Sequence, residues 1–111
     1  MNKQKICHVD DLIKNSGICA LATIKGQEQQ VAIFHLPETE NKIYAIGNWD
    51  PLGGANILSR GIVGNIGDEI VVASPLYKQH FSLTTGKCLE EDASVPVYDI
   101  TLENDEVFIA A

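Results

Sequence analysis

Short apolar stretches separated by turn residues run along most of this chain, and no helical periodicity persists for three turns. That pattern indicates strands, because a helix would show its apolar residues at every third or fourth position. The sequence therefore predicts an all-β fold. The expected strands span residues 5–8, 18–24, 30–35, 42–46, 70–73, 79–83, 97–102 and 106–109.

Three short segments predict how some of these strands are connected. The pairs Lys-Gly at residues 25–26 and Asn-Asp at residues 104–105 are expected to form hairpin turns, although the second lacks the usual glycine. Residues 10–13 are expected to form one helical turn that ends at Gly17, because glycine tolerates the left-handed conformation found at helix ends.

The length of 111 residues suits one domain, and no linker or internal repeat divides the chain, so we expect a single domain over residues 1–111. The apolar runs are shorter than the roughly 20 residues that a membrane span requires. The first residues lack the apolar stretch and cleavage site of a secretory signal. We therefore expect a cytoplasmic protein without a membrane partner.

The net charge of −7 is distributed unevenly. All eight basic residues precede residue 88, whereas residues 88–111 contain seven acidic residues and no basic one. Such a segment would repel phosphate backbones, so we expect no nucleic acid partner. Its acidic residues could steer docking onto a basic protein surface, or could only keep turns and strand edges soluble.

The middle of the chain is rich in glycine, with six of the nine glycines between residues 47 and 67. We expect a long ordered excursion between strands there, built on backbone conformations that glycine adopts easily. The excursion contains the only tryptophan, Trp49. Residues 61–67 do not match the glycine pattern of a dinucleotide-binding loop, so a nucleotide site is not expected.

Neither a disulfide framework nor a hydrolase is indicated. The three cysteines lack close spacing, and a metal site would have to be assembled from scattered residues, namely Cys7, His8, Cys19, His35, His80 and Cys88. Ser82 and His80 should share one face of a strand. However, the sequence supplies no recognisable orienting acid or oxyanion hole for them.

Two short segments each have polar residues at both ends. Residues 48–50 read Asn-Trp-Asp before a proline, and residues 74–77 read Ser-Pro-Leu-Tyr, followed later by a Thr-Gly turn. These segments resemble the two cluster-binding loops of Rieske ferredoxins, which read Cys-x-His and Cys-Pro-Leu-His. The resemblance implies an antiparallel β-sandwich or barrel like that of Rieske iron–sulfur proteins, with a two-loop subdomain at about residues 47–61 and 74–86.

The four ligand positions of these loops are occupied by Asn48, Asp50, Ser74 and Tyr77. A Rieske cluster is bound by cysteine thiolates on one iron and histidine imidazoles on the other. Serine, asparagine and a phenol with a pKa of about 10 are poor substitutes at neutral pH. Only Asp50 offers an anionic oxygen, so we expect no metal, cofactor or catalytic residue in this chain.

Longer stretches of the sequence indicate a more specific family. Residues 51–64, 73–79 and 85–89 are similar to the small subunit of cytoplasmic NAD(P)H-dependent nitrite reductase, a family with a Rieske-type fold that lacks the cluster ligands. The resemblance implies a partner, the large subunit, which carries FAD, an iron–sulfur cluster and siroheme and reduces nitrite to ammonium. It also implies that this chain is a non-catalytic subunit of an assimilatory enzyme.

The two loops suggest a docking tip for that large subunit, because the same loops face the redox partner in Rieske ferredoxins. Trp49, Leu52 and Tyr77 would be its buried anchors, since such side chains dominate many interfaces. Arg60 and Lys78 would be charges at its rim. Alternatively, Trp49 and Leu52 cap the sheet core at the former cluster position.

Two other functions remain open at this point. The chain could be an electron carrier of the Rieske type with an atypical metal site. It could also be a free-standing protein-binding module, because a fold alone does not determine function.

Overall fold

The computed structural model describes residues 3–76 and 78–110. These residues form twelve strands and two short 3₁₀ helices, which confirms the predicted all-β class. In chain order the elements are β1 (Lys3–His8), η1 (Val9–Asp11), β2 (Ser16–Ile24), β3 (Gln27–His35), β4 (Ile43–Gly47), β5 (Trp49–Asp50), β6 (Ala55–Asn56), η2 (Leu58–Arg60), β7 (Ile62–Ile66), β8 (Glu69–Ala73), β9 (His80–Ser82), β10 (Val97–Tyr98), β11 (Ile100–Glu103) and β12 (Glu106–Ala110). Within the described ranges, no helix is long and apolar enough to cross a membrane.

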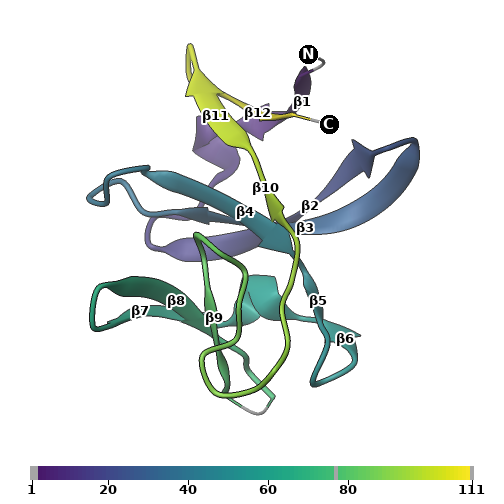
Figure 1. Ribbon diagram of the computed structural model, residues 1–111. Coiled ribbons are helices and arrows are strands. Elements are labelled where there is room, and N and C mark those ends of the chain that lie inside the picture. The colour runs from purple at the N-terminus through teal and green to yellow at the C-terminus, as the bar shows by residue number, and fades with distance from the viewer. Residues whose placement is uncertain (1–2, 77, 111) are drawn as a thin grey trace.

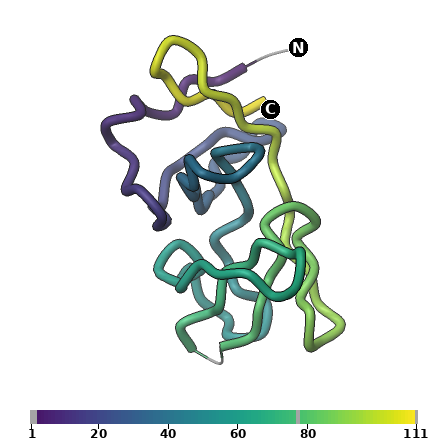
Figure 2. Tube along the Cα trace, turned by 90° about the vertical axis from the view of Figure 1, so that its left-hand side faces the viewer, coloured from purple at the N-terminus to yellow at the C-terminus, as the bar shows by residue number. Residues whose placement is uncertain are grey.

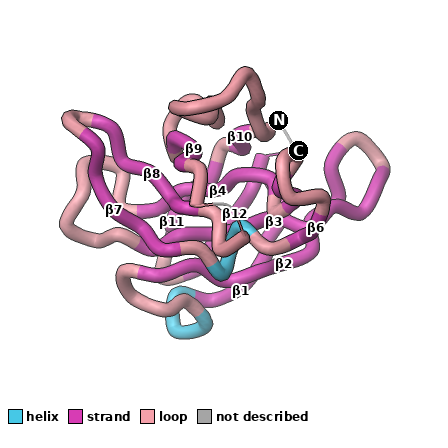
Figure 3. The backbone as a smooth tube through the Cα atoms, turned by 90° about the horizontal axis from the view of Figure 1, so that it is seen from below, coloured by secondary structure: helices cyan, strands magenta, loops and turns pink. Residues whose placement is uncertain are grey.

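The strands form four antiparallel sheets arranged in two halves (Figure 1). The upper half contains the sheet β1–β12–β11 and the sheet β10–β4–β3–β2. The lower half contains the sheet β7–β8–β9 and the small hairpin β5–β6. Figure 2 shows the same division from the side, with the teal and green segments gathered in the lower half. Figure 3 shows from below that strands and loops account for nearly all of the described chain.

Strands β3 and β4 lie between two hydrophobic cores, because successive side chains of a strand point to opposite faces. Ala32 and Phe34 of β3 belong to the core of the lower half, whereas Val31 and Ile33 belong to the core of the upper half. The lower core also includes Leu58 of η2 and residues of β8 and β9. It therefore joins the sheet β7–β8–β9 and η2 to the central sheet.

The predicted hairpin turns are confirmed. Residues 25–26 join β2 to β3 and residues 104–105 join β11 to β12. All four have positive φ, between 51° and 82°. This is the geometry of the two-residue turns that suit the twist of antiparallel strands.

The predicted helical turn is displaced, and its expected end at Gly17 is wrong. The 3₁₀ helix spans Val9–Asp11, and Leu12 already has extended backbone. Gly17 lies inside β2, with η2 packed closely against it. A Cβ on Gly17 would lie 2.6 Å from both a ring carbon of Phe34 and the carbonyl oxygen of Ser59. The glycine therefore permits close packing and does not end a helix.

Two further strand predictions differ from the structure. The expected strand at residues 97–102 is split into β10 and β11, which belong to different sheets. The glycine-rich excursion is not irregular throughout, since it contains β5, β6, η2 and β7. Strand β7 has a glycine at its centre and mostly exposed side chains, so its sequence lacks the apolar alternation that identifies strands.

Candidate functional site

Two loops meet at the lower end of the molecule, far from the chain termini (Figure 1). The first follows β4 and contains the hairpin β5–β6 together with η2. The second connects β8 to β9 and begins at Ser74. Three of the four former ligand positions, Asn48, Asp50 and Ser74, are at most 1% exposed. The fourth, Tyr77, lies outside the described residues.

The carboxylate of Asp50 joins the two loops. Its Oδ1 accepts hydrogen bonds from the backbone N–H groups of Leu52 at 2.8 Å and Gly53 at 3.0 Å. Its Oδ2 accepts a hydrogen bond from the Ser74 hydroxyl at 2.5 Å. Both carboxylate oxygens are therefore occupied by protein donors. Asp50 of the first loop and Ser74 of the second loop are thus directly hydrogen bonded.

Asn48 connects the first loop to the central sheet. Its side-chain nitrogen donates to Gln30 Oε1 at 3.2 Å and lies 3.5 Å from the sulfur of Cys19. Its side-chain oxygen accepts from the N–H of Ser59 at 2.7 Å. Its backbone carbonyl accepts from the N–H of Leu58 at 3.1 Å. The asparagine thus fixes the position of η2 under the sheet.

This arrangement does not fit an iron–sulfur cluster. Amide and hydroxyl groups replace the soft thiolate and imidazole donors that a Rieske cluster needs. The one carboxylate is saturated by hydrogen bonds, and a Cβ on Gly53 would lie only 2.8 Å from Leu76 Cδ1 and 2.9 Å from Asp50 Oδ2. The two loops therefore pack on each other where a cluster would have to fit.

The scattered cysteines and histidines do not assemble either. Across residues 3–76 and 78–110, no group of three His, Cys, Asp or Glu side chains is placed to bind a metal ion. His80 and Ser82 also have separate partners. His80 Nδ1 lies 2.7 Å from Glu90 Oε2, and the buried Ser82 hydroxyl donates to Glu69. The N–H of His80 lowers the pKa of Glu90 through a hydrogen bond, with a further contribution from its imidazole.

The predicted docking residues differ in exposure. Trp49 is 52% exposed, and Arg60 and Lys78 are exposed as well. Leu52 is partly buried and packs against the lower core. Leu52 thus lies against the core, as the capping alternative expects, whereas about half of the Trp49 side chain remains exposed.

The sequence did not single out two other features of this end. Leu76 is half-exposed, although its side chain reaches Gly53 of the other loop. Trp49 borders a groove of about 310 Å³ whose other lining includes Pro51, Pro96 and Tyr98. Burial raises the pKa of Tyr98. Pro96 and Tyr98 come from a distant part of the chain, so only the tertiary structure brings them to Trp49.

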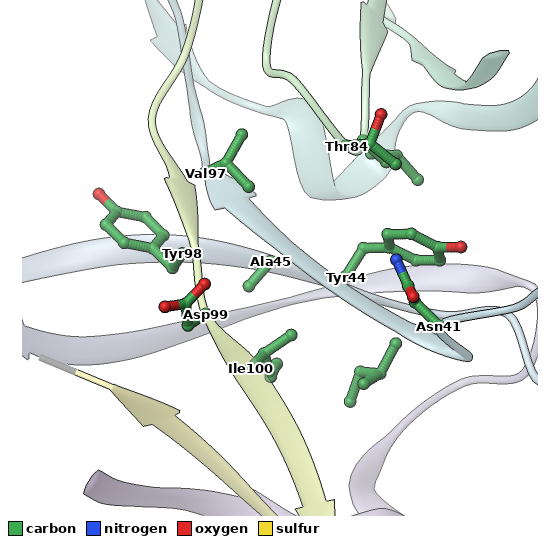
Figure 4. Close-up of a pocket in the computed structure, with 10 residues that line it drawn as sticks. Asn41, Tyr44, Ala45, Thr84, Val97, Tyr98, Asp99 and Ile100 are labelled. Atoms are coloured by element: carbon green, nitrogen blue, oxygen red, sulfur yellow. The ribbon is translucent and has the colours of Figure 1, made fainter. Parts of the chain in front are cut away.

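A second cavity of about 310 Å³ lies between β4 and the segment of β10 and β11 (Figure 4). Ala45 and Ile100 lie at its centre in that view, with Tyr44 and Tyr98 on opposite sides. The Tyr44 hydroxyl donates to Thr39 at 3.0 Å. Among the residues that line the cavity, Asp99 is the only carboxylate, and there is no histidine, cysteine or lysine. These residues do not form an acid–base pair.

Comparison with known proteins identifies related sequences. Residues 2–110 match the family model of the Rieske-like [2Fe-2S] domain. The small subunit of NADH nitrite reductase from Salmonella typhimurium is 43% identical over 105 residues, which cover 94% of this chain and 93% of that protein. The large subunit of NAD(P)H nitrite reductase from Klebsiella oxytoca is 36% identical over 107 residues, which cover 96% of this chain and 10% of that protein.

Solved structures show the same similarity in three dimensions. The solution structure of the NAD(P)H nitrite reductase small subunit from Erwinia carotovora has a TM-score of 0.77 and 43% identity, covering 98% of this chain and 81% of that one. The ferredoxin of carbazole 1,9a-dioxygenase from Nocardioides aromaticivorans has a TM-score of 0.77 at 20% identity, with 99% and 98% coverage. The second likeness concerns the fold alone, and it confirms the predicted Rieske-type architecture.

Proposed function

Because the chain belongs to the Rieske-like domain family and, within it, to the small subunits of nitrite reductase, we propose that it is the non-catalytic small subunit of an NAD(P)H-dependent nitrite reductase. It supports the reduction of nitrite to ammonium by a large subunit that carries FAD, an iron–sulfur cluster and siroheme. The observation that carries this proposal is the similarity to such small subunits over nearly the whole chain. The cytoplasm is the expected compartment, with no nucleic acid or membrane partner.

The hydrogen bonds of the two loops support a role without a cluster of its own. In a Rieske electron carrier, two thiolates and two imidazoles occupy the four ligand positions of these loops. Here Asp50 and Ser74 bind each other, and Asn48 binds η2 and the central sheet. Hydrogen bonds between protein groups thus join the loops, which supports their use as a docking surface.

The Klebsiella relative supports the identity of the partner. In that protein a segment similar to this chain is part of the large-subunit polypeptide and makes up 10% of it. Covalent linkage gives two modules a high effective concentration for each other, so the linkage in that relative indicates that the two parts act together. We therefore take the large subunit as the partner of this chain.

The docking tip consists of Trp49, Leu52, Arg60 and Lys78, with Tyr77 as a further proposed member. The exposed indole of Trp49 beside a groove provides the rigid aromatic surface that many interfaces bury at their centre. Leu52 anchors the tip to the core. Arg60 and Lys78 supply positive charge at the rim, which favours an acidic surface on the large subunit.

The test measures binding of the purified chain to the purified large subunit, together with nitrite-dependent NAD(P)H oxidation with and without the chain. We expect Trp49→Ala to weaken binding by about tenfold or more, since hot-spot tryptophans contribute on that scale. Leu21→Ala is the matched control, because Leu21 is similarly exposed on β2. Binding unchanged by Trp49→Ala would remove Trp49 from the interface.

Two further measurements distinguish the other functions. Iron analysis and the visible spectrum of anaerobically purified protein test the electron carrier, for which stoichiometric iron would be required. The free-standing module is tested by the same binding assay, because that function predicts no affinity for the large subunit.

A further inference from the structure

The outer face of β7 is apolar and uncovered. Ile62 is 79% exposed and Ile66 is 44% exposed, and both point away from the lower core. A Cβ on Gly64, which lies between them on the same face, would meet no heavy atom within 4 Å. Exposed apolar residues that share one strand face are more informative than isolated ones, because they form a continuous surface.

Strand β7 is also at the edge of its sheet, which has the order β7–β8–β9. Residues 62–66 read Ile-Val-Gly-Asn-Ile and contain no charged residue and no proline. Proteins normally protect edge strands with such residues, since an open edge pairs readily with another chain. The unprotected edge therefore points to a partner that covers it.

Two other edge strands carry such protection. At β2, Gln4 covers the edge at Thr23, because its side-chain amide exchanges two hydrogen bonds of 2.9 Å with the backbone of that residue. Edge strand β11 carries Glu103, which is paired with Lys3 of β1. These protections lie in the upper half of the molecule. Strand β7 itself carries no charged side chain of this kind.

The exposed face of β7 begins at the docking tip. Ile62 pairs with Ala73, the residue immediately before Ser74, and Ser74 is hydrogen bonded to Asp50 of the other loop. Arg60, a proposed rim residue, precedes Ile62 by two positions. The docking tip and the outer face of β7 are therefore continuous along the chain and across the sheet.

We propose that the docking surface for the large subunit extends from the tip along the outer face of β7, where an uncharged extended segment of the large subunit covers Ile62 and Ile66. This inference rests on the proposed function. Strands β1 and β12, which hold the chain ends, pair at the opposite end of the molecule (Figure 1). A large-subunit polypeptide joined at that end, as in a relative with both parts in one chain, leaves β7 and the tip free to dock.

The experiment compares the affinity of the intact chain for the purified large subunit with that of Ile62→Lys, Trp49→Ala and the control Leu21→Lys. Lysine is tolerated on exposed edge strands, so Ile62→Lys is expected to fold, as circular dichroism will check. We expect Ile62→Lys to raise the Kd at least tenfold and Leu21→Lys, at a site 57% exposed on β2, to change it less than twofold. Hydrogen exchange of the intact chain supplies an independent readout, with slower exchange at residues 62–66 when the large subunit is bound.

The outcomes separate the two proposals. If the unmodified chain binds, Trp49→Ala weakens binding and neither Ile62→Lys nor exchange at residues 62–66 shows an effect, the β7 inference is wrong and the proposed function stands. If the unmodified chain does not bind the large subunit, the proposed function fails and the inference with it. If the chain self-associates through β7 and Ile62→Lys abolishes only that association, a second copy is the occupant and the inference is overturned.

Discussion

The hydrogen bond between Asp50 and Ser74 joins the two loops at the lower end of the molecule. The buried carboxylate of Asp50 receives donors from its own loop and from the Ser74 hydroxyl. Such hydrogen bonds matter for stability, because burying a carboxylate without hydrogen-bond partners costs free energy. The geometry of the tip thus depends on hydrogen bonds within the protein.

Ser74→Ala removes the hydroxyl that connects the loops and should lower the free energy of unfolding by about 1–3 kcal/mol. The cause is the loss of a donor to a carboxylate that remains buried. Urea unfolding followed by tryptophan fluorescence measures the change. Ser94→Ala, at an exposed serine, is the control and should stay within about 0.5 kcal/mol of the unmodified protein. Equal stability of the two variants would contradict a structural role for the Asp50–Ser74 hydrogen bond.

At the same scale, the sequence drew attention to individual positions but could not predict their contacts. The spacing within residues 48–50 and 74–77 led to the former ligand positions through a family resemblance. The hydrogen bond between Asp50 and Ser74 joins residues 24 positions apart, and no local pattern encodes such a contact. The groove beside Trp49 is likewise lined by Pro96 and Tyr98, which only the fold brings there.

At the scale of elements, strands with continuous or alternating apolar residues were predictable, and the elements within the glycine-rich excursion were not. Strand β3 was recognised from its run of apolar residues, which fill both cores. The elements β5, β6, η2 and β7 are short or exposed, and their conformation is set by packing under the central sheet. The break between β10 and β11 was missed because the apolar pattern continues across Asp99, where the chain passes from one sheet to another.

Gly17 illustrates how packing between elements overrides a local signal. Its position in β2 lets η2 approach closely. The methyl group added by Gly17→Ala should push Ser59 and Phe34 away from the strand and lower the free energy of unfolding by about 1–3 kcal/mol. Thermal or urea unfolding measures the change. Gly64→Ala is the matched control, because a Cβ there meets open space within a strand. It should change stability by no more than about 0.5 kcal/mol. A similar loss in both variants would indicate that strand propensity, and not close packing, determines the effect.

At the scale of the whole molecule, the two ends of the fold have different properties. The end with β1 and β12 carries the chain termini and the ion pairs Lys3–Glu103 and Lys5–Glu106. The opposite end carries the exposed Trp49 and the uncovered face of β7. This difference between the two ends suits a subunit that presents one end to a larger enzyme. The fold class followed from the sequence pattern, but this division of surface followed only from the structure.

We propose that this chain is a cluster-free subunit that binds the large subunit of nitrite reductase. Native mass spectrometry of the two proteins purified together under anaerobic conditions tests it most directly. We predict a complex with one copy of this chain per large subunit, from which the chain is released with the mass of its polypeptide alone. Absence of a complex, or release of a chain that carries the additional mass of an iron–sulfur cluster, would contradict this function.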